Sequence, residues 1–257
     1  MSGQFVGAMC ATGVLNMNVW GWPTLGLKIG VFFAGILWLA LNYLDNQGYD
    51  YPLIRLKYYL LLLLAPLVWM EGFAQWQFFA NLNPEVITSC CGSLFSSDGE
   101  GVASEITSIP APSSMLLLYG TGLLVLLNGV MFALTRRGGR LLMLTATLAF
   151  VSALVAIVAF VSPYVYEHPH HHCPFCLLKS GHDFVGYWLY ILLFFATASS
   201  LMAGVMVNWR QRQSLRQVVP PLTRRLSWMG VALFSLFYLL ATWLVYRSNL
   251  TMEGVWW

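Results

Sequence analysis

The sequence predicts an all-α membrane protein, a polytopic bundle of six transmembrane helices with a seventh candidate span near the N-terminus. Of its 257 residues, 58% are hydrophobic and only 9% are charged, whereas a soluble domain usually carries about 25% charged residues. A chain of this composition cannot cover a water-facing surface, which excludes a soluble enzyme. The net charge of +3 is too small to indicate a nucleic-acid-binding protein. We therefore expect a lipid bilayer, and no nucleic acid, as its partner.

Six apolar stretches have the length that a helix needs to cross the hydrocarbon core, about 20 residues. In chain order, these predicted spans are 24–43, 58–79, 114–134, 141–161, 184–207 and 226–246. Segment 5–20 is ambiguous, because it is short and carries Asn16 and Asn18. It is either a seventh span or an amphipathic segment at the membrane interface. On this interpretation the whole chain, 1–257, forms one integral-membrane domain.

Charged residues separate the spans and orient them. The connections 44–57, 135–140 and 208–225 contain ten of the thirteen Lys and Arg residues, so the positive-inside rule places them in the cytoplasm. Loops 80–113 and 162–183 contain six acidic residues and a single basic residue. These two loops are therefore predicted to be exoplasmic, which in a bacterial inner membrane means that they face the periplasm.

Reactive side chains are concentrated in the two exoplasmic loops, which hold four of the five cysteines and all five histidines. Loop 162–183 contains Cys173-Pro174-Phe175-Cys176, whose C-x-x-C spacing is typical of redox-active cysteine pairs. This motif lies just before the fifth span, so we expect it in the first turn of that helix, where the helix dipole stabilises a thiolate. A structural disulfide between Cys173 and Cys176 is the alternative.

Cys90 and Cys91 lie in loop 80–113, on the oxidising side of the membrane where disulfides persist. Adjacent cysteines rarely bond to each other, because the resulting ring strains the peptide between them. We consider two roles for this pair. It exchanges disulfides with Cys173 or Cys176, or it permanently staples the two exoplasmic loops together.

The histidine run beside the C-x-x-C motif offers a second chemistry, because imidazoles and thiolates are ligands for zinc and copper(I). The candidate ligands are His168, His170, His171, His172, Cys173 and Cys176. Their spacing is not that of a zinc finger, and a solvated patch that titrates near neutral pH is the alternative. No predicted span contains a histidine, which argues against a haem held by two histidines between helices.

Glu71 is the only acidic residue inside a predicted span. A carboxylate at that depth is costly, so it should face the protein interior and be paired or protonated. It is a candidate for a proton path to a quinone, or alternatively for a packing hydrogen bond. Aromatic residues gather near the exoplasmic ends of the spans, and Trp76 and Phe175 among them are candidates to wall a quinone headgroup. An ordinary interfacial aromatic belt is the alternative.

The order of these parts resembles the membrane thiol oxidoreductases of the vitamin K epoxide reductase type and, less closely, the bacterial DsbB type. A loop with a cysteine pair, two further spans and a C-P-x-C before a descending helix follow one another between Tyr58 and Val207. The resemblance implies a four-helix bundle in which electrons pass from Cys90 and Cys91 to the C-P-x-C and then to a quinone.

The resemblance further implies that Cys176 faces the quinone and that Cys173 exchanges with the loop pair, with a periplasmic thioredoxin-like protein as a candidate partner. The sequence departs from the family pattern in its adjacent loop cysteines, its extra spans and its histidine run. The favoured hypothesis is an integral-membrane thiol–disulfide oxidoreductase coupled to a quinone. The alternatives are an exoplasmic copper- or zinc-binding membrane protein, and a structural subunit that joins other membrane subunits in a larger complex with disulfide-stapled loops.

Overall fold

The computed structural model describes residues 11–82 and 106–252, and within these ranges the chain is helical without any β-strand. Six helices there are long and apolar enough to cross a membrane, which confirms the predicted all-α membrane bundle. They are α2 (Gly21–Gln47), α3 (Ile54–Ala80), α5 (Ala111–Thr135), α6 (Gly139–Ala156), α8 (Val185–Met206) and α9 (Val219–Tyr246). Beyond its end, α6 continues through a π-helical turn, Ile157–Val161, into α7 (Ser162–Tyr166).

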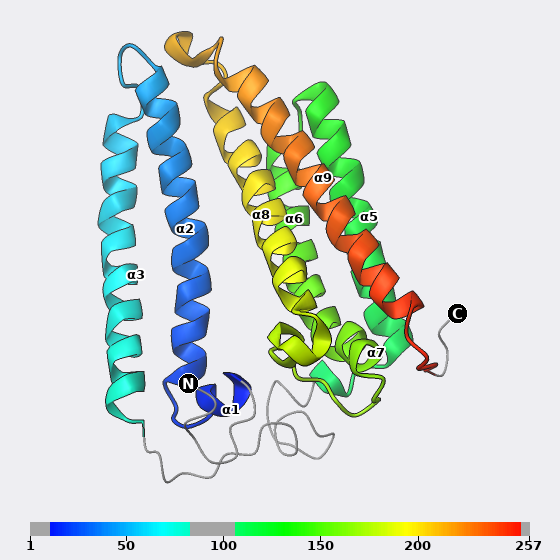
Figure 1. Cartoon of the computed structure of the whole chain (residues 1–257). Helices are drawn as coiled ribbons and strands as arrows, with labels where there is room; N and C mark the ends of the chain where they lie inside the picture. Colours follow the sequence, from blue (N-terminus) through cyan, green and yellow to red (C-terminus); the bar gives the residue numbers. More distant parts are fainter. Residues whose placement is uncertain (1–10, 83–105, 253–257) are drawn as a thin grey trace.

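The helices run alternately in opposite directions, so their connections lie at two ends of the bundle (Figure 1). These two ends carry different kinds of side chain. One end, which we call the arginine end, contains the α2–α3, α5–α6 and α8–α9 connections and most of the arginines. The other, which we call the cysteine end, contains the loop between α7 and α8 with Cys173 and Cys176. The basic connections and the cysteine motif thus lie at opposite ends of the molecule.

Four of the helices form a closed ring. In this ring, α9 packs against α5 and α8, and α6 packs against the same two helices. The α2–α3 hairpin stands beside the ring and contacts it mainly through α2 and α8 (Figure 1). Within α3 only Ala74 and Phe78 are buried, so most of the surface of this helix faces lipid in a membrane.

Small residues let the ring helices approach one another closely. At the crossing of α6 and α8, a Cβ atom on Gly204 would lie only 2.7 Å from the carbonyl oxygen of Gly139. Between α5 and α9, the hydroxyl of Ser227 donates a hydrogen bond to the carbonyl oxygen of Gly129 at 2.8 Å. Because lipid tails are as apolar as the helices, helices in a membrane associate through such close packing and hydrogen bonding.

An aromatic cluster joins α2 to the ring. The ring of Phe33 stacks on that of Phe194 at a centroid distance of 5.6 Å and meets Phe150 edge-on at 5.0 Å. Phe32 also meets Phe194 edge-on, at 5.3 Å. Offset and edge-to-face contacts of this kind are the favourable arrangements for aromatic pairs, so this cluster fixes the position of α2 against α6 and α8.

Polar side chains join α2 to α3 inside the hairpin. Glu71 pairs with Lys28 Nζ at 2.5 Å, and the same ammonium donates to Gln75 Oε1 at 2.7 Å. Glu71 is thus paired, as its depth requires, but its partner belongs to the neighbouring helix of the hairpin and not to the ring. The two residues meet because Lys28 on α2 and Glu71 on α3 both lie about two turns from the cysteine end.

The arginine end of the hairpin is closed by a buried ion pair. Asp45 is fully buried and lies 2.8 Å from Lys57 Nζ. Its other carboxylate oxygen accepts the backbone N–H of Leu53 at 2.7 Å. A buried charge must be paired and hydrogen-bonded to be tolerated, and these contacts fix the turn that connects α2 to α3.

The N-terminal segment contains a short helix, α1 (Ala11–Leu15), followed by turns that lead into α2. Residues 5–10 lie outside the described ranges, so the choice between a seventh span and an interfacial segment stays a prediction. Asn18 donates to the carbonyl oxygens of Phe78 and Asn81 at 3.0 and 3.3 Å. This asparagine thus ties the segment to the end of α3.

We expect Gly204→Ala to destabilise the protein by about 1–3 kcal/mol, the usual cost of overpacking. The added methyl group would collide with backbone of α6, which cannot move as a flexible side chain can. Gly35→Ala is the matched control, because a Cβ on Gly35 meets no atom within 4 Å. It should be neutral or stabilising by up to about 1 kcal/mol. Thermal unfolding in detergent compares the two variants, and equal effects would contradict the close α6–α8 crossing.

Candidate functional site

The C-x-x-C motif lies in the loop between α7 and α8. The prediction from the sequence that it occupies the first turn of α8 was wrong. Helix α8 begins only at Val185, and Cys176 instead opens a single 3-10 turn, Cys176–Leu178. Asp183 and Phe184 both adopt left-handed backbone conformations, with φ of 54° and 53°. Two successive residues of this kind cannot continue a right-handed helix, so the helix cannot extend back to the motif. The dipole of α8 therefore does not act on these thiols from within the same helix.

A glycine lets the 3-10 turn rest directly on α8. A Cβ atom on Gly186 would lie 2.8 Å from Leu177 Cβ and 2.9 Å from the carbonyl carbon of that leucine. Leu177 itself is fully buried. The motif is therefore packed against the start of α8, although it is not part of that helix.

Both cysteines of the motif are buried, with exposed fractions of 0% for Cys173 and 7% for Cys176. No disulfide joins these two to each other in the described part of the chain. The hydroxyl of Thr12, a buried residue of α1, lies 3.1 Å from Cys173 Sγ. A hydroxyl that donates to a thiolate favours the charged form of the sulfur, whereas burial opposes it. The N-terminal segment thus contributes directly to the environment of Cys173.

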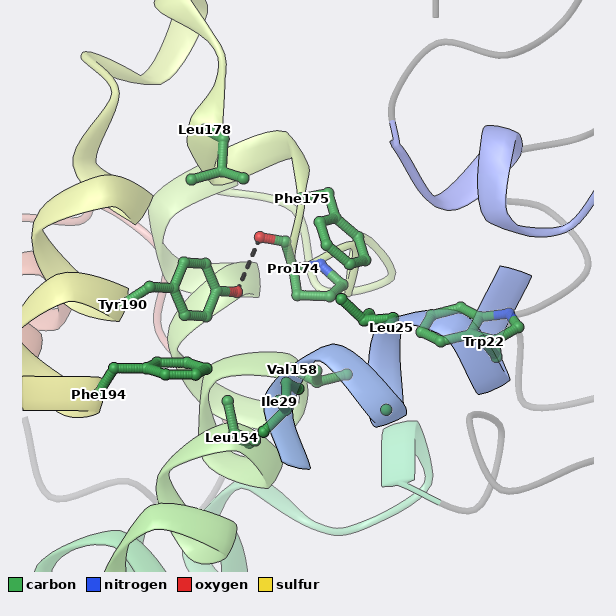
Figure 2. Close-up of a pocket in the computed structure, with 11 residues that line it drawn as sticks. Trp22, Leu25, Ile29, Leu154, Val158, Pro174, Phe175, Leu178, Tyr190 and Phe194 are labelled. Carbon is green, nitrogen blue, oxygen red and sulfur yellow. Dashed lines mark hydrogen bonds between the residues drawn. The ribbon is translucent and has the colours of Figure 1, made fainter. Parts of the chain in front are cut away.

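Two tyrosines hold the backbone of the motif. The hydroxyl of Tyr166, at the end of α7, donates to the carbonyl oxygen of Cys173 at 2.6 Å. The hydroxyl of Tyr190, in α8, donates to the carbonyl oxygen of Pro174 at 3.0 Å (Figure 2). Because this backbone has left the helical path, these side chains supply the hydrogen bonds that a helix would otherwise make.

The histidines of the run make separate contacts. The Nδ1 atom of buried His172 donates to the carbonyl oxygen of Val158, in the π-helical turn, at 3.0 Å. Burial lowers the pKa of His172, and the hydrogen bond to Val158 offsets only part of this effect. The ring of His171 packs on that of Tyr166 at 4.2 Å, whereas His168 and His170 are exposed.

No group of three or more His, Cys, Asp or Glu side chains is placed to bind a metal ion within residues 11–82 and 106–252. The predicted ligand set of four histidines and two cysteines therefore does not converge on one point there. Cys90 and Cys91 lie outside the described residues, so neither exchange with the motif nor stapling of the loops is tested. The copper or zinc site and the role of the loop pair stay predictions.

The loop is also tied to the segment that follows α9. Glu167 accepts hydrogen bonds from the backbone N–H and the side-chain amide of Asn249 at 3.0 and 2.9 Å, and these bonds lower the pKa of its carboxyl group. The hydroxyl of Ser248 donates to the carbonyl oxygen of Tyr164 at 2.7 Å. Contacts from both α1 and the chain beyond α9 thus hold the cysteine loop in place.

An apolar cavity of about 460 Å³ lies beside the motif, where α2 meets the ring (Figure 2). Its walls come from α2, α6 and the π-helical turn that follows it, the cysteine loop and α8. The lining residues are Trp22, Leu25, Gly26, Ile29, Leu154, Val158, Pro174, Phe175, Leu178, Tyr190 and Phe194. Pro174 and Phe175, the two residues between the cysteines, form part of the wall. This volume is within the range of small-molecule sites, which are mostly apolar with a few polar groups.

The cavity includes one of the three residues that the sequence suggested for a quinone site. Phe175 lines it, with its ring 6.3 Å from that of Trp22. Glu71 and Trp76 do not line it. Both belong to α3, where the exposed side chain of Trp76 borders a shallow depression on the surface of that helix.

Sequence reasoning missed several residues of the site. Trp22 and Gly26 are one turn apart on α2, and Tyr190 and Phe194 are one turn apart on α8. This spacing places each pair on one helix face, but the sequence does not determine which face turns toward the motif. For Thr12 no signal in the sequence pointed to the cysteines.

Comparison of the chain with protein families, curated proteins and solved structures finds no match. A functional proposal therefore depends on the chemistry of the site alone. The site combines two buried thiols with an adjacent apolar cavity and tyrosine hydroxyls that fix the backbone between them. Such an arrangement suits electron transfer between a dithiol and an apolar two-electron acceptor.

We expect the cysteine loop to open more readily as the pH falls below about 6.5, the ordinary pKa of histidine. Because the folded state lowers the pKa of His172, its contribution to stability is complete above 6.5 and is lost as the pH falls toward the folded-state value. Amide hydrogen exchange of peptides from 167–184 at pH 7.5 and 5.5, corrected for intrinsic exchange rates, measures this opening.

His172→Gln should reduce the acid response, since glutamine still donates to Val158 but does not titrate. Burial also lowers the pKa of His182, so part of the response should persist in this variant. His168→Gln, at an exposed position of the same loop, is the control and should keep the full response. A wild-type acid response in His172→Gln would show that this imidazole does not control the loop.

Proposed function

We propose that the protein is an integral-membrane thiol–disulfide oxidoreductase that passes electrons from Cys173 and Cys176 to a membrane quinone. One observation carries the proposal: the residues between the two cysteines, Pro174 and Phe175, form a wall of the apolar cavity. A quinone headgroup is a flat, largely apolar ring with two carbonyl oxygens. The cavity supplies aromatic walls for such a ring, and it adjoins the two residues that separate the thiols.

The hydroxyl of Tyr190 gives the cavity a polar group. This hydroxyl donates to the carbonyl oxygen of Pro174, and its oxygen keeps the capacity to accept a further hydrogen bond. A quinol hydroxyl could donate to it. A single polar contact in an apolar pocket orients a ligand without a large cost of desolvation.

The proposed reaction balances without a further oxidant. Oxidation of the Cys173–Cys176 dithiol breaks two S–H bonds, forms one S–S bond and releases two electrons and two protons. The quinone takes up both electrons and both protons, and forms the two O–H bonds of the quinol. A second dithiol then reduces the Cys173–Cys176 disulfide by thiol–disulfide exchange.

The proposal extends to the donor and to the membrane. The acidic, cysteine-bearing loops and the basic connections favour a bacterial inner membrane with the cysteine end in the periplasm. The donor is then a periplasmic thioredoxin-like dithiol protein, which acts on the motif directly or through Cys90 and Cys91. Contacts with Thr12, Tyr166 and Tyr190 support this role, because they hold the motif in one geometry for both half-reactions.

We expect Cys173→Ser and Cys176→Ser each to abolish quinone reduction, because one remaining thiol cannot form the disulfide within the motif. The assay uses the purified full chain in detergent, with dithiothreitol as donor and a short-chain ubiquinone analogue whose absorbance reports reduction. Cys10→Ser, which also removes one thiol, is the control and should retain turnover, because both cysteines of the motif remain.

Wild-type protein that fails to reduce the quinone under these conditions would refute the proposal. A stoichiometric zinc or copper ion that is lost on replacement of His170–His172 would instead favour the metal-binding alternative. Inert disulfides whose reduction only loosens a larger complex would favour the structural subunit.

Gly26→Leu should raise the KM for the quinone by about tenfold, which corresponds to ~1.4 kcal/mol, because its side chain would occupy the cavity. Gly26 lines the cavity, and a Cβ there meets no atom within 4 Å. Gly30→Leu is the matched control, since Gly30 lies one turn further along α2, is equally unobstructed and does not line the cavity. Steady-state kinetics with varied quinone compares the two. Equal KM values would show that the quinone does not use this cavity.

A further inference from the structure

A second cavity, of about 400 Å³, lies at the arginine end between the α5–α6 turn and the end of α8. Its lining contains four arginines together with small and amide side chains. The arginines are Arg136, Arg137, Arg140 and Arg210. We propose that this cavity binds the phosphate of an anionic phospholipid headgroup. The proposal is independent of the redox chemistry at the opposite end.

The conformation of the α5–α6 turn places the first residues of α6 in the lining of this cavity. Arg136 and Gly138 adopt left-handed conformations, with φ of 55° and 81°. Gly138 precedes α6 and provides no side chain to cap it, and both Gly138 and Gly139 line the cavity. The first N–H groups of a helix have no partner within the helix, and they attract phosphate together with the helix dipole.

Arg210 joins the two walls of the cavity. Its Nη1 atom donates to the carbonyl oxygen of Arg136 at 2.7 Å, which holds the end of α8 against the α5–α6 turn. A guanidinium carries five N–H donors, so Arg210 keeps donors for a ligand after making this bond. The side chains of Asn208 and Gln211 add neutral polar groups to the same lining.

Four exposed guanidinium groups around one cavity create a positive potential that attracts an anion. Among the ion pairs of residues 11–82 and 106–252, none involves these four arginines. The buried carboxylate at this end, Asp45, is engaged by Lys57. Arginine binds phosphate oxygens through two parallel hydrogen bonds, which a single ammonium cannot provide. A phosphate group therefore matches both the charge and the donor geometry of the cavity.

The position of the cavity favours a lipid as the source of that phosphate. It lies where α5, α6 and α8 end (Figure 1), at the level at which membrane helices meet the headgroup layer. Exposed leucines flank it along the helices, with Leu134 65% exposed on α5 and Leu141 44% exposed on α6. An acyl chain attached to the bound headgroup would cover these leucines. Basic pockets between transmembrane helices are known to bind anionic headgroups.

The experiment compares two double variants of the full chain that remove equal charge from the same end. Arg137→Gln/Arg140→Gln alters the cavity, whereas Arg224→Gln/Arg225→Gln, the matched control, alters exposed arginines that do not line it. Native mass spectrometry of detergent-solubilised protein titrated with phosphatidylglycerol measures the apparent Kd. We expect about tenfold weaker binding in the cavity variant, the scale of one to two lost headgroup contacts, and a much smaller change in the control.

Phosphatidylcholine with the same acyl chains should bind weakly to all proteins, because its headgroup has no net charge. Equal weakening by the two double variants, or equal affinity for the two lipids, would overturn the proposal. Inorganic phosphate is the second probe. If it stabilises the wild type but not the cavity variant against heat, while phosphatidylglycerol binds both alike, the ligand is free phosphate and not a lipid. Arg137→Gln alone replaces the double variant if that variant does not fold.

Discussion

Hydrogen bonding of the backbone in the absence of water is the constraint on which this structure depends. An unsatisfied N–H or C=O group in the hydrocarbon core costs several kcal/mol, so the chain crosses it only as helices. Where the chain leaves the helical path at the cysteine end, Tyr166 and Tyr190 donate to backbone carbonyls of the motif, and His172 donates to Val158. The bonds that satisfy this backbone therefore also set the geometry of the cysteines.

Glycine residues serve two purposes in the bundle. Within the ring, Gly139 and Gly204 bring α6 and α8 into backbone contact and leave no free space. On α2, which belongs to the hairpin, Gly26 faces no atom within 4 Å and lines the cavity. The cavity thus lies at the junction between the closed ring and the hairpin, and it adjoins the cysteine motif because that loop extends over the same junction.

The sequence predicts the spans well, because length and apolarity are local properties. Helix α9 begins seven residues before the predicted start at Leu226, since Pro220 and Pro221 fit the first turn of a helix. The placement of the motif in α8 was wrong, because the left-handed conformations before that helix leave no signal in the sequence. The Lys28–Glu71 pair, the contact of Thr12 with Cys173 and the cavity depend on how helices rotate and pack, which hydropathy does not encode.

The attachment of the N-terminal segment has a mechanical consequence. Asn18 ties this segment to the end of α3, and Thr12 in the same segment covers the sulfur of Cys173. Helix α2, the other half of the hairpin, forms one wall of the cavity. A displacement of the hairpin away from the ring would therefore separate Thr12 from the thiol of Cys173 and widen the cavity at the same time. In the proposed reaction, access of a donor thiol to Cys173 and access of the quinone to the cavity would then change together.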